Sequence, residues 1–324
     1  MRRFGLLAAL GLARPAAGGH PFRDRMQQRL AERRAALEEG IVDEGLAVDA
    51  RFVLPAGAAV ERDLNYGDDP AQRLDVYRPV SASGAPVMLF VHGGGWRRGD
   101  KAMPRMVANK VTHWVGQGHV FVSTNYRMLP DADPLEQADD VARALAFVQA
   151  QAGRWGGDPA RVVVIGHSAG AHLVSLITAD TALAAHHGAQ PWLATVAIDS
   201  AALDIEAIMT RRHYRFYDPV FGSDPTFWRL ASPMHRLQSR PVAPMLLICS
   251  SQRDDSSIAA HAFAAKAATF GGRAEVLALD MNHMELNDGL GLPGDYTAGV
   301  DAFLHTLAAS RETPLRGRDS PLLE

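Results

Sequence analysis

The most constraining feature of this sequence is an alternation, from about residue 60 onward, of short apolar runs rich in β-branched residues with longer segments of helical periodicity. Eight runs predict strands: 61–66, 74–78, 87–92, 119–126, 161–166, 195–199, 245–249 and 274–279. Five segments predict helices: 103–116, 134–154, 169–182, 256–270 and 295–309. Because strands alternate with helices, we expect an α/β domain with a mostly parallel, eight-stranded sheet and helices on both faces.

The alternation of strands and helices is interrupted at 202–241, a segment rich in aromatic and turn residues between two predicted strands. We expect it to form a cap over the carboxyl-terminal edge of the sheet, where open α/β sheets place their sites. The chain has 324 residues, about twice the length of an average domain. The insertion favours one domain over 21–310 rather than two, followed by a flexible tail at 311–324.

The N-terminus has two interpretations. Arg2 and Arg3 precede an apolar stretch at 4–13, which is the order found in secretory signal peptides, and the stretch is shorter than the ~20 residues that span a bilayer. Residues 1–20 are therefore predicted to be a signal peptide or a disordered N-terminus. The protein is exported, to the periplasm or the medium, in the first case and cytoplasmic in the second. Residues 21–45 predict an amphipathic helix ahead of the main domain.

The composition argues against several classes of partner. Lys and Arg number 33 against 36 Asp and Glu, and the net charge of −3 provides no cationic field for nucleic acid or an anionic membrane. The single cysteine, Cys249, excludes an internal disulfide framework and a zinc site made of clustered cysteines. We expect a small-molecule substrate, no nucleic-acid partner, no integral membrane segment and no metal. The oligomeric state stays open.

The most specific motif is Gly166-His167-Ser168-Ala169-Gly170, which follows the predicted strand 161–166 and precedes a helix. Glycines two positions either side of a serine allow a tight strand-to-helix turn that presents the hydroxyl. The helix N-terminus beyond it favours developing negative charge. We call residues 166–170 the elbow and predict that Ser168 is a nucleophile.

A second motif, His92-Gly93-Gly94-Gly95-Trp96, follows the strand 87–92, and we call it the glycine loop. It does not fit a nucleotide site. A G-x-G-x-x-G pattern from Gly93 requires glycine where Arg98 stands, and a P-loop from Gly94 requires lysine at Asp100.

The glycine loop instead fits an oxyanion hole, which requires only backbone amides aimed at an acyl oxygen. We predict that Gly94, Gly95 and Ala169 supply these amides. His92, at the strand end behind the glycines, is expected to be structural.

A serine hydroxyl needs a base, and this base is expected to follow a late strand. His283 does so, in a loop after the last predicted strand. The alternatives among the thirteen histidines have packing or solvated roles by position; they are His167, His172, His186, His187 and His305.

The acid that orients the base is expected after the preceding strand, where Asp254 and Asp255 are adjacent. Counting from the strand end favours Asp254. The acid-x-x-aliphatic spacing from Asp255 to Ile258 favours Asp255, which is our preferred residue. The unused carboxylate is expected to be the N-cap of the helix that follows.

With serine, acid and histidine in that order, the chain resembles the α/β-hydrolase superfamily, and within it the HGGG-bearing esterases. These include the hormone-sensitive-lipase group and the arylformamidase-like group, with kynurenine formamidases and BD-type feruloyl esterases. Further similar segments are Asn-Tyr-Arg-Met-Leu-Pro at 125–130, Asp-Pro-Ala-Arg at 158–161 and Leu-Asp-Val-Tyr-Arg-Pro at 74–79. The resemblance covers about residues 60–310. It does not extend to the acid, because the usual G-x-x-D is replaced by Ser-Ser-Gln-Arg-Asp-Asp at 250–255.

The resemblance implies a serine carboxylesterase that hydrolyses small to medium carboxylic esters through an acyl-enzyme and requires no cofactor. The aromatic cap favours an apolar acyl group or an aromatic leaving group. An arylformamidase-like amide hydrolase would use the same residues. A catalytically silent binding module is the third hypothesis, and the presence of Ser168 and His283 argues against it.

Overall fold

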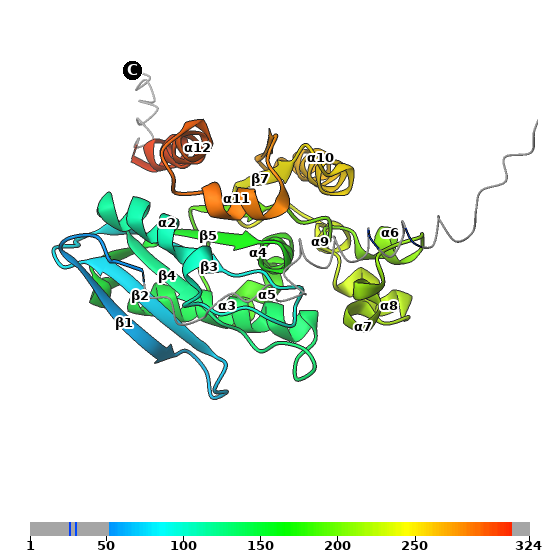
Figure 1. The fold of residues 1–324 in the computed structure, drawn as a ribbon, viewed down its shortest axis with the longest axis horizontal. Helices are drawn as coiled ribbons and strands as arrows, with labels where there is room; N and C mark the ends of the chain where they lie inside the picture. Colours follow the sequence, from blue (N-terminus) through cyan, green and yellow to red (C-terminus); the bar gives the residue numbers. More distant parts are fainter. Residues whose placement is uncertain (1–25, 27–29, 31–51, 313–324) are drawn as a thin grey trace, which may run out of the picture.

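A single eight-stranded sheet forms the centre of the structure, in the order β1-β2-β4-β3-β5-β6-β7-β8 (Figure 1). Strand β2 is antiparallel to both of its neighbours, and β3 to β8 are parallel to one another. The strands are β1 (Ala58–Asn65), β2 (Arg73–Pro79), β3 (Ala85–Val91), β4 (Val120–Thr124), β5 (Gly157–His167), β6 (Ala194–Ile198), β7 (Met245–Ser250) and β8 (Ala274–Leu279). The predicted mostly parallel α/β architecture is confirmed.

The computed structural model describes Met26, Leu30 and residues 52–312. The predicted signal peptide or disordered N-terminus at 1–20 lies outside the described residues. So does the predicted helix at 21–45, apart from Met26 and Leu30, and so does the tail beyond residue 312.

The helices that flank the sheet overlap the segments with helical periodicity, apart from α11 and most of α5. They are α2 (Pro104–Gly116), α3 (Pro134–Gln151) with the 3-10 turn η1 (Ala152–Trp155), α4 (Ala169–Ala179), α5 (Thr181–His186), α10 (Asp254–Thr269), α11 (His283–Gly289) and α12 (Asp295–Glu312). The short helix α11 was not predicted, although a capping box marks its start. In this box the Asn282 side chain accepts from the Glu285 amide while the Glu285 side chain accepts from the Asn282 amide.

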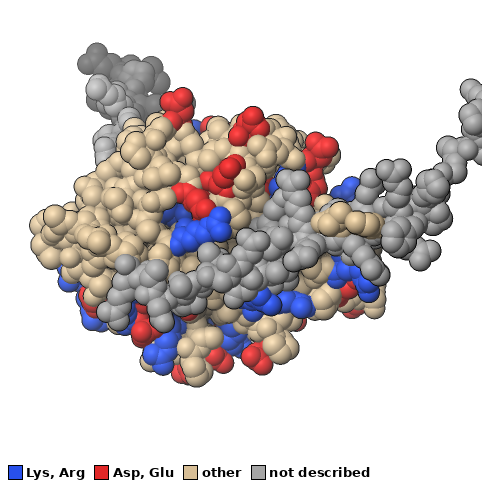
Figure 2. Space-filling view, viewed as in Figure 1, with Lys and Arg blue, Asp and Glu red and all other residues tan. Residues whose placement is uncertain are grey.

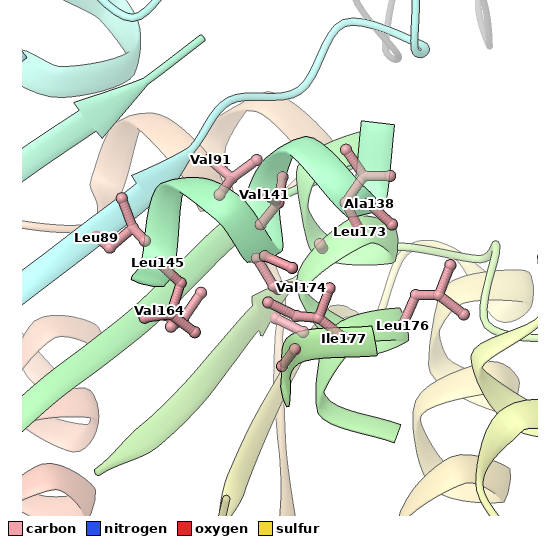
Figure 3. Packing of buried hydrophobic residues seen from close by; sticks show 14 of the residues in the cluster. Leu89, Val91, Ala138, Val141, Leu145, Val164, Leu173, Val174, Leu176 and Ile177 are labelled. Carbon is pink, nitrogen blue, oxygen red and sulfur yellow. The ribbon is translucent and has the colours of Figure 1, made fainter. Parts of the chain in front are cut away.

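The core has two parts, one on each face of the sheet, because alternate strand residues point to opposite faces. In β3, Leu89 packs on the face that carries α3, α4 and α10, whereas Phe90 packs on the face that carries α2, α11 and α12. Figure 3 shows the first face, where Val141 and Leu145 of α3 meet Val174 of α4 above the strands. The strand ends that bear the predicted site are thereby fixed from both sides.

A cap of short helices lies between β6 and β7. It consists of α6 (Ile205–Met209), η2 (Arg215–Tyr217), α7 (Asp218–Phe221), α8 (Pro225–Leu230) and α9 (Pro233–Arg236), and it gathers at the right-hand end of Figure 1. The buried Ser232 ties it together: the hydroxyl accepts from the Ile205 amide at 2.7 Å and donates to the Trp228 carbonyl at 2.8 Å. The cap is therefore held by its own hydrogen bonds as well as by its aromatic residues.

Acidic and basic side chains are interspersed on the face shown in Figure 2. Within the described part of the chain, no helix combines the length and the apolar character needed to cross a membrane.

Candidate active site

Ser168 occupies a strained turn between β5 and α4. Its backbone has φ 55° and ψ −117°, a region that residues with a Cβ rarely adopt. Such a conformation costs on the order of 1–3 kcal/mol and persists only where the surroundings enforce it. Here the Ser168 amide donates to the Ile198 carbonyl at 2.9 Å, and the His172 amide donates to the Ser168 carbonyl at 3.0 Å. The neighbouring strand and the first turn of α4 thus hold the elbow.

Both glycines of the elbow are required by close backbone contacts. A Cβ at Gly166 would lie 2.3 Å from the Gly170 carbonyl oxygen, and a Cβ at Gly170 would lie 2.2 Å from the Val91 carbonyl oxygen. Because backbone atoms cannot give way as a flexible side chain can, any larger residue would push α4 away from β3 and β5.

The glycine loop packs directly against the elbow. A Cβ at Gly93 would lie 2.9 Å from the Ser168 Cβ. Gly94 and Gly95 have φ values of 122° and 59°, so the chain folds back tightly after Gly93. Gly94 and Gly95, the first two predicted oxyanion donors, therefore follow the residue that contacts Ser168, and Ala169, the third, begins α4.

His92 lies behind the glycines, as expected of a structural residue. Its ring stacks on Tyr126 with centroids 4.7 Å apart, and the Tyr126 hydroxyl donates to the His92 carbonyl at 3.0 Å. Burial lowers the pKa of His92. A neutral, buried imidazole in this position supports the glycine loop.

His283 is buried at the first position of α11, next to the elbow. The ring of His167 lies against that of His283, with centroids 4.5 Å apart. His167 Nε2 also lies 3.0 Å from the His283 carbonyl oxygen and donates to it. Burial, followed by the charge of His283, lowers the pKa of His167 well below its ordinary value, which favours this neutral form. The structure thus brings the chain segments of Ser168 and His283 together through His167.

The structure places a carboxylate other than Asp254 or Asp255 beside His283. His283 Nδ1 lies 2.6 Å from the carboxylate Oδ2 of Asp199, the residue that follows β6. Asp254 is exposed, and Asp255 makes an ion pair of 3.4 Å with Arg253. The helix α10 begins at Asp254, two residues earlier than predicted, so both carboxylates lie in its first turn. The N-cap is Arg253, without a side-chain cap bond, which also corrects the expected N-cap role of the unused carboxylate.

The Asp199 carboxylate is fully engaged. Oδ1 accepts from the Ser250 amide at 2.9 Å and from the Ser256 hydroxyl. Oδ2 accepts from His283 and from Arg253 Nη1, the latter at 3.2 Å. Burial alone would raise the pKa of Asp199, but the bonds and charges of these partners hold the pKa well below its ordinary value.

One signal in the sequence could have indicated Asp199. Ser168 and Asp199 directly follow His167 and Ile198, which are register partners of the adjacent strands β5 and β6. Asp199, like Ser168, has a positive φ of 51°, a conformation that aspartate tolerates better than most residues. An aspartate at the carboxyl end of a buried parallel strand beside the nucleophile strand was therefore a candidate. We instead expected the acid after β7, the strand that precedes β8 in the chain.

His172 links the glycine loop to the cap. Its Nδ1 accepts from the indole Nε1 of Trp96 at 3.1 Å, and its Nε2 donates to the Ala231 carbonyl at 2.7 Å. Burial lowers the pKa of His172 to about 4, so the ring is neutral with its hydrogen on Nε2 at neutral pH. Trp96 also meets the cap residue Phe221 edge to face, with centroids 5.1 Å apart. His172 therefore has a bridging role, beyond the packing role expected from its position.

A cavity of about 990 Å³ opens beside His283 and Arg253. The cap contributes one wall and α10 the other. Its apolar lining comprises Ala201, Leu203, Ala207, Ile208, Tyr214, Tyr217, Met234, Ile258, Ala259 and Ala262, and its charged lining includes Asp204, Arg211, Arg212, Asp254 and Asp255. Among the described residues, no group of three or more His, Cys, Asp or Glu side chains could hold a metal ion.

The chain is similar in sequence to known esterases. Residues 74–205 match the BD-FAE family model. The chain is 31% identical to Esterase LipC of Mycobacterium tuberculosis over 208 residues, which cover 60% of this chain and 51% of LipC. It is 33% identical to the probable isoprenylcysteine alpha-carbonyl methylesterase ICMEL1 of Arabidopsis thaliana, over 36% of this chain and 24% of that protein. The chain thus spans about half or less of the length of these relatives.

Solved structures show the same fold. Esterase B from Lactobacillus rhamnosis has a TM-score of 0.66 at 20% identity, covering 89% of this chain and 96% of that one. Esterase 2 of Thermogutta terrifontis has a TM-score of 0.61 at 22% identity, covering 78% of this chain and 95% of that one. The chain has the α/β-hydrolase fold, and its resemblance to the HGGG-type serine esterases of that superfamily is confirmed.

Proposed function

We propose that this protein is a serine carboxylesterase that hydrolyses small to medium carboxylic esters through an acyl-enzyme. The observation that carries the proposal is the buried Asp199–His283 pair beside the strained elbow of Ser168. The relatives that the chain resembles are named as esterases, which supports an ester as the substrate. No cofactor is required for this chemistry.

In the first step, Ser168 Oγ attacks the ester carbonyl carbon while His283 Nε2 takes the hydroxyl proton. The tetrahedral intermediate collapses when His283 returns that proton to the leaving alcohol, and the acyl group stays on Ser168. Water then attacks the acyl-enzyme with the same base, and the carboxylic acid leaves. Each histidine step requires that Nδ1 carries the other ring hydrogen.

Asp199 enforces this requirement. A carboxylate only accepts hydrogen bonds, so its contact of 2.6 Å with Nδ1 favours the tautomer with hydrogen on that nitrogen. The negative charge then stabilises the imidazolium that forms during proton transfer. Bonds from Ser250 and Ser256 fix the carboxylate and keep it ionised.

The negative oxygen of the tetrahedral intermediate is held by the amides of Gly94, Gly95 and Ala169. Loss of one such donor typically costs about 2.7–4 kcal/mol of transition-state stabilisation. The contact between Gly93 and Ser168 supports this role, because it keeps the glycine loop at the nucleophile.

The cavity favours an apolar group on the substrate. Its walls carry Leu203, Ile208, Tyr217 and Met234, which would bury an alkyl chain or an aromatic ring. Since His283 is one of the residues that line the cavity, a group seated there lies beside the proposed base.

A p-nitrophenyl ester series on matched variants tests the proposal. Ser168→Ala and Asp199→Asn are each expected to lower kcat by about 10⁴-fold, because the nucleophile is removed or the histidine tautomer is wrong. Asp254→Asn and Asp255→Asn serve as controls and are expected to stay within a few-fold of wild type. Loss of activity in Asp255→Asn with full activity in Asp199→Asn would contradict the assignment of the acid.

A pre-steady-state burst of p-nitrophenol would report the acyl-enzyme directly. A fluorophosphonate probe is expected to label wild type and not Ser168→Ala. If wild type instead cleaves an N-formyl aromatic amide and no ester, the protein is an amide hydrolase that uses the same residues.

A further inference from the structure

Arg253 lies in contact with the Asp199–His283 pair, and the proposed mechanism does not use it. Its Nη1 lies 3.2 Å from Asp199 Oδ2 and 2.7 Å from His283 Nδ1. Its Nε lies 3.4 Å from Asp255 Oδ1 on the other side, and the side chain is only 14% exposed. A cation is therefore held against the nitrogen through which the acid acts.

The position of Arg253 in the chain explains how it comes to lie there. When the usual G-x-x-D after this strand is counted with Ser250 in place of the glycine, the fourth position is Arg253. The carboxylate comes from Asp199, after β6, and the place expected for the acid after β7 holds an arginine.

Arg253 and Asp199 favour opposite tautomers of His283. A neutral imidazole has hydrogen on one ring nitrogen only. Donation from Nδ1 to Asp199 leaves Nε2 able to accept a proton. Donation from Arg253 to Nδ1 requires a lone pair on Nδ1 and places the hydrogen on Nε2, which cannot then accept the proton of Ser168. Arg253 also opposes the positive charge that His283 gains during proton transfer.

We propose that Arg253 is a positioning residue that restrains His283, both by competing with Asp199 for Nδ1 and by disfavouring the imidazolium. This inference rests on the proposed esterase mechanism. If so, the side chain at position 253 determines the pH range over which His283 acts as a base. It also determines the value of kcat/KM at the plateau of the pH profile.

The other charged or titratable groups around His283 do not duplicate this effect. His167 is neutral and bonds to the His283 carbonyl oxygen, not to its ring. Asp255 lies behind Arg253 and partly offsets its charge. Lys110 of α2 reaches α11 at the Asn287 carbonyl, 2.7 Å from its Nζ, rather than at His283. Tyr296 of α12 donates to the Leu286 carbonyl at 2.8 Å.

The test is the pH dependence of kcat/KM with p-nitrophenyl butyrate for wild type, Arg253→Gln and Arg253→Lys. Without the cation, the imidazolium persists to higher pH, so the acid limb of the Arg253→Gln profile is expected to move upward by about one pH unit. The plateau is expected to rise roughly two- to tenfold as the base becomes stronger and the productive tautomer more populated. Arg253→Lys keeps the charge and is expected to leave the acid limb near that of wild type.

Arg240→Gln is the matched charge control, because Arg240 is exposed, does not line the cavity and contacts neither Asp199 nor His283 in any described interaction. It is expected to leave both limb and plateau unchanged. An equal shift in Arg240→Gln would mean that only the net charge matters and would overturn the proposal. An unmoved limb with a lower plateau in Arg253→Gln would overturn it in favour of a purely structural role.

Nitrogen-15 NMR of the histidine rings gives a second readout that does not require turnover. The fraction of His283 with hydrogen on Nδ1 is expected to be higher in Arg253→Gln than in wild type, and an equal fraction overturns the proposal. This measurement also separates the proposed role of Arg253 from the proposed esterase function. If no ester is hydrolysed, the proposed function fails, whereas the competition for Nδ1 is still decided by the spectra.

Discussion

His283 Nδ1 and Asp199 Oδ2 lie 2.6 Å apart, although the two residues are 84 positions apart in the chain. Both side chains are fully buried. Water therefore does not screen their interaction, and the geometry of the pair depends on the strand ends and loops that carry it. The first prediction follows from the charge of this carboxylate.

Asp199→Asn is expected to make the free energy of unfolding less dependent on pH in acid solution. The pKa of Asp199 is lower in the folded protein than its ordinary value of 3.8. The ionised carboxylate therefore contributes stability that is fully present above pH 3.8 and is lost as the pH falls below it. Urea unfolding between pH 5 and 3 should show a smaller decline in the free energy of unfolding for Asp199→Asn than for wild type. The exposed Asp254→Asn should keep the wild-type decline, and an identical decline in Asp199→Asn would contradict the prediction.

Gly170→Ala is expected to destabilise the protein, since the new Cβ would lie 2.2 Å from the Val91 carbonyl oxygen. Overpacking of this kind costs about 1–3 kcal/mol, and it should also reduce activity by displacing the elbow. Gly116→Ala, at the end of α2, is the matched control: nothing lies within 4 Å of its Cβ. It should be neutral or stabilising by up to about 1 kcal/mol. Thermal unfolding of the two variants decides, and equal stability would refute the contact argument.

His172→Gln is expected to reduce the loss of stability on mild acidification. The pKa of His172 is about 4 in the folded protein and 6.5 ordinarily, so the unfolded chain binds the proton first as the pH falls. Stability is therefore lost between pH 6.5 and about 4, by up to about 3 kcal/mol. Urea unfolding across this range should be flatter for the variant. His261→Gln, an exposed substitution on α10, should match wild type. A variant as steep as wild type would show that His172 does not titrate in this way.

Ala262→Phe is expected to shorten the acyl chains that the enzyme accepts. Ala262 lines the cavity from α10, and a phenyl ring there would fill space that we assign to an apolar substrate group. Each excluded methylene forfeits about 0.8 kcal/mol, so loss of three lowers kcat/KM for p-nitrophenyl octanoate by roughly 50-fold. The butyrate ester should be affected little. Ala265→Phe places the same ring on the exposed face of α10 as a control. An equal loss of kcat/KM for both esters would mean that the acyl chain does not bind in this cavity.

The framework of the fold could be predicted because it is encoded locally. Buried strands are short and β-branched, and the long helices carry their apolar residues at helical spacing, so all eight strands overlap their predicted segments. The elbow and the glycine loop could be recognised because backbone contacts leave room only for glycine at Gly93, Gly166 and Gly170.

The proposed acid was harder to predict, because its one sequence signal is its place at the end of a predicted buried strand. Asp199 is a single aspartate at a strand end, whereas Asp254 and Asp255 stood where the acid was expected. The bond from Arg253 to Asp199 depends on the tertiary arrangement of β6, β7 and α10. The helices of the cap are likewise too short, at three to six residues, to show a helical period.

Ser168 and Asp199 directly follow His167 and Ile198, which are register partners in the adjacent parallel strands β5 and β6. The spacing between the proposed nucleophile and its acid is thus set by the pairing of two parallel strands inside the sheet. The connection from β7 to α10 carries no part of the proposed triad. It brings Arg253 against Asp199 and His283, so a substitution at Arg253 can retune the proposed base while the proposed nucleophile and acid keep their places.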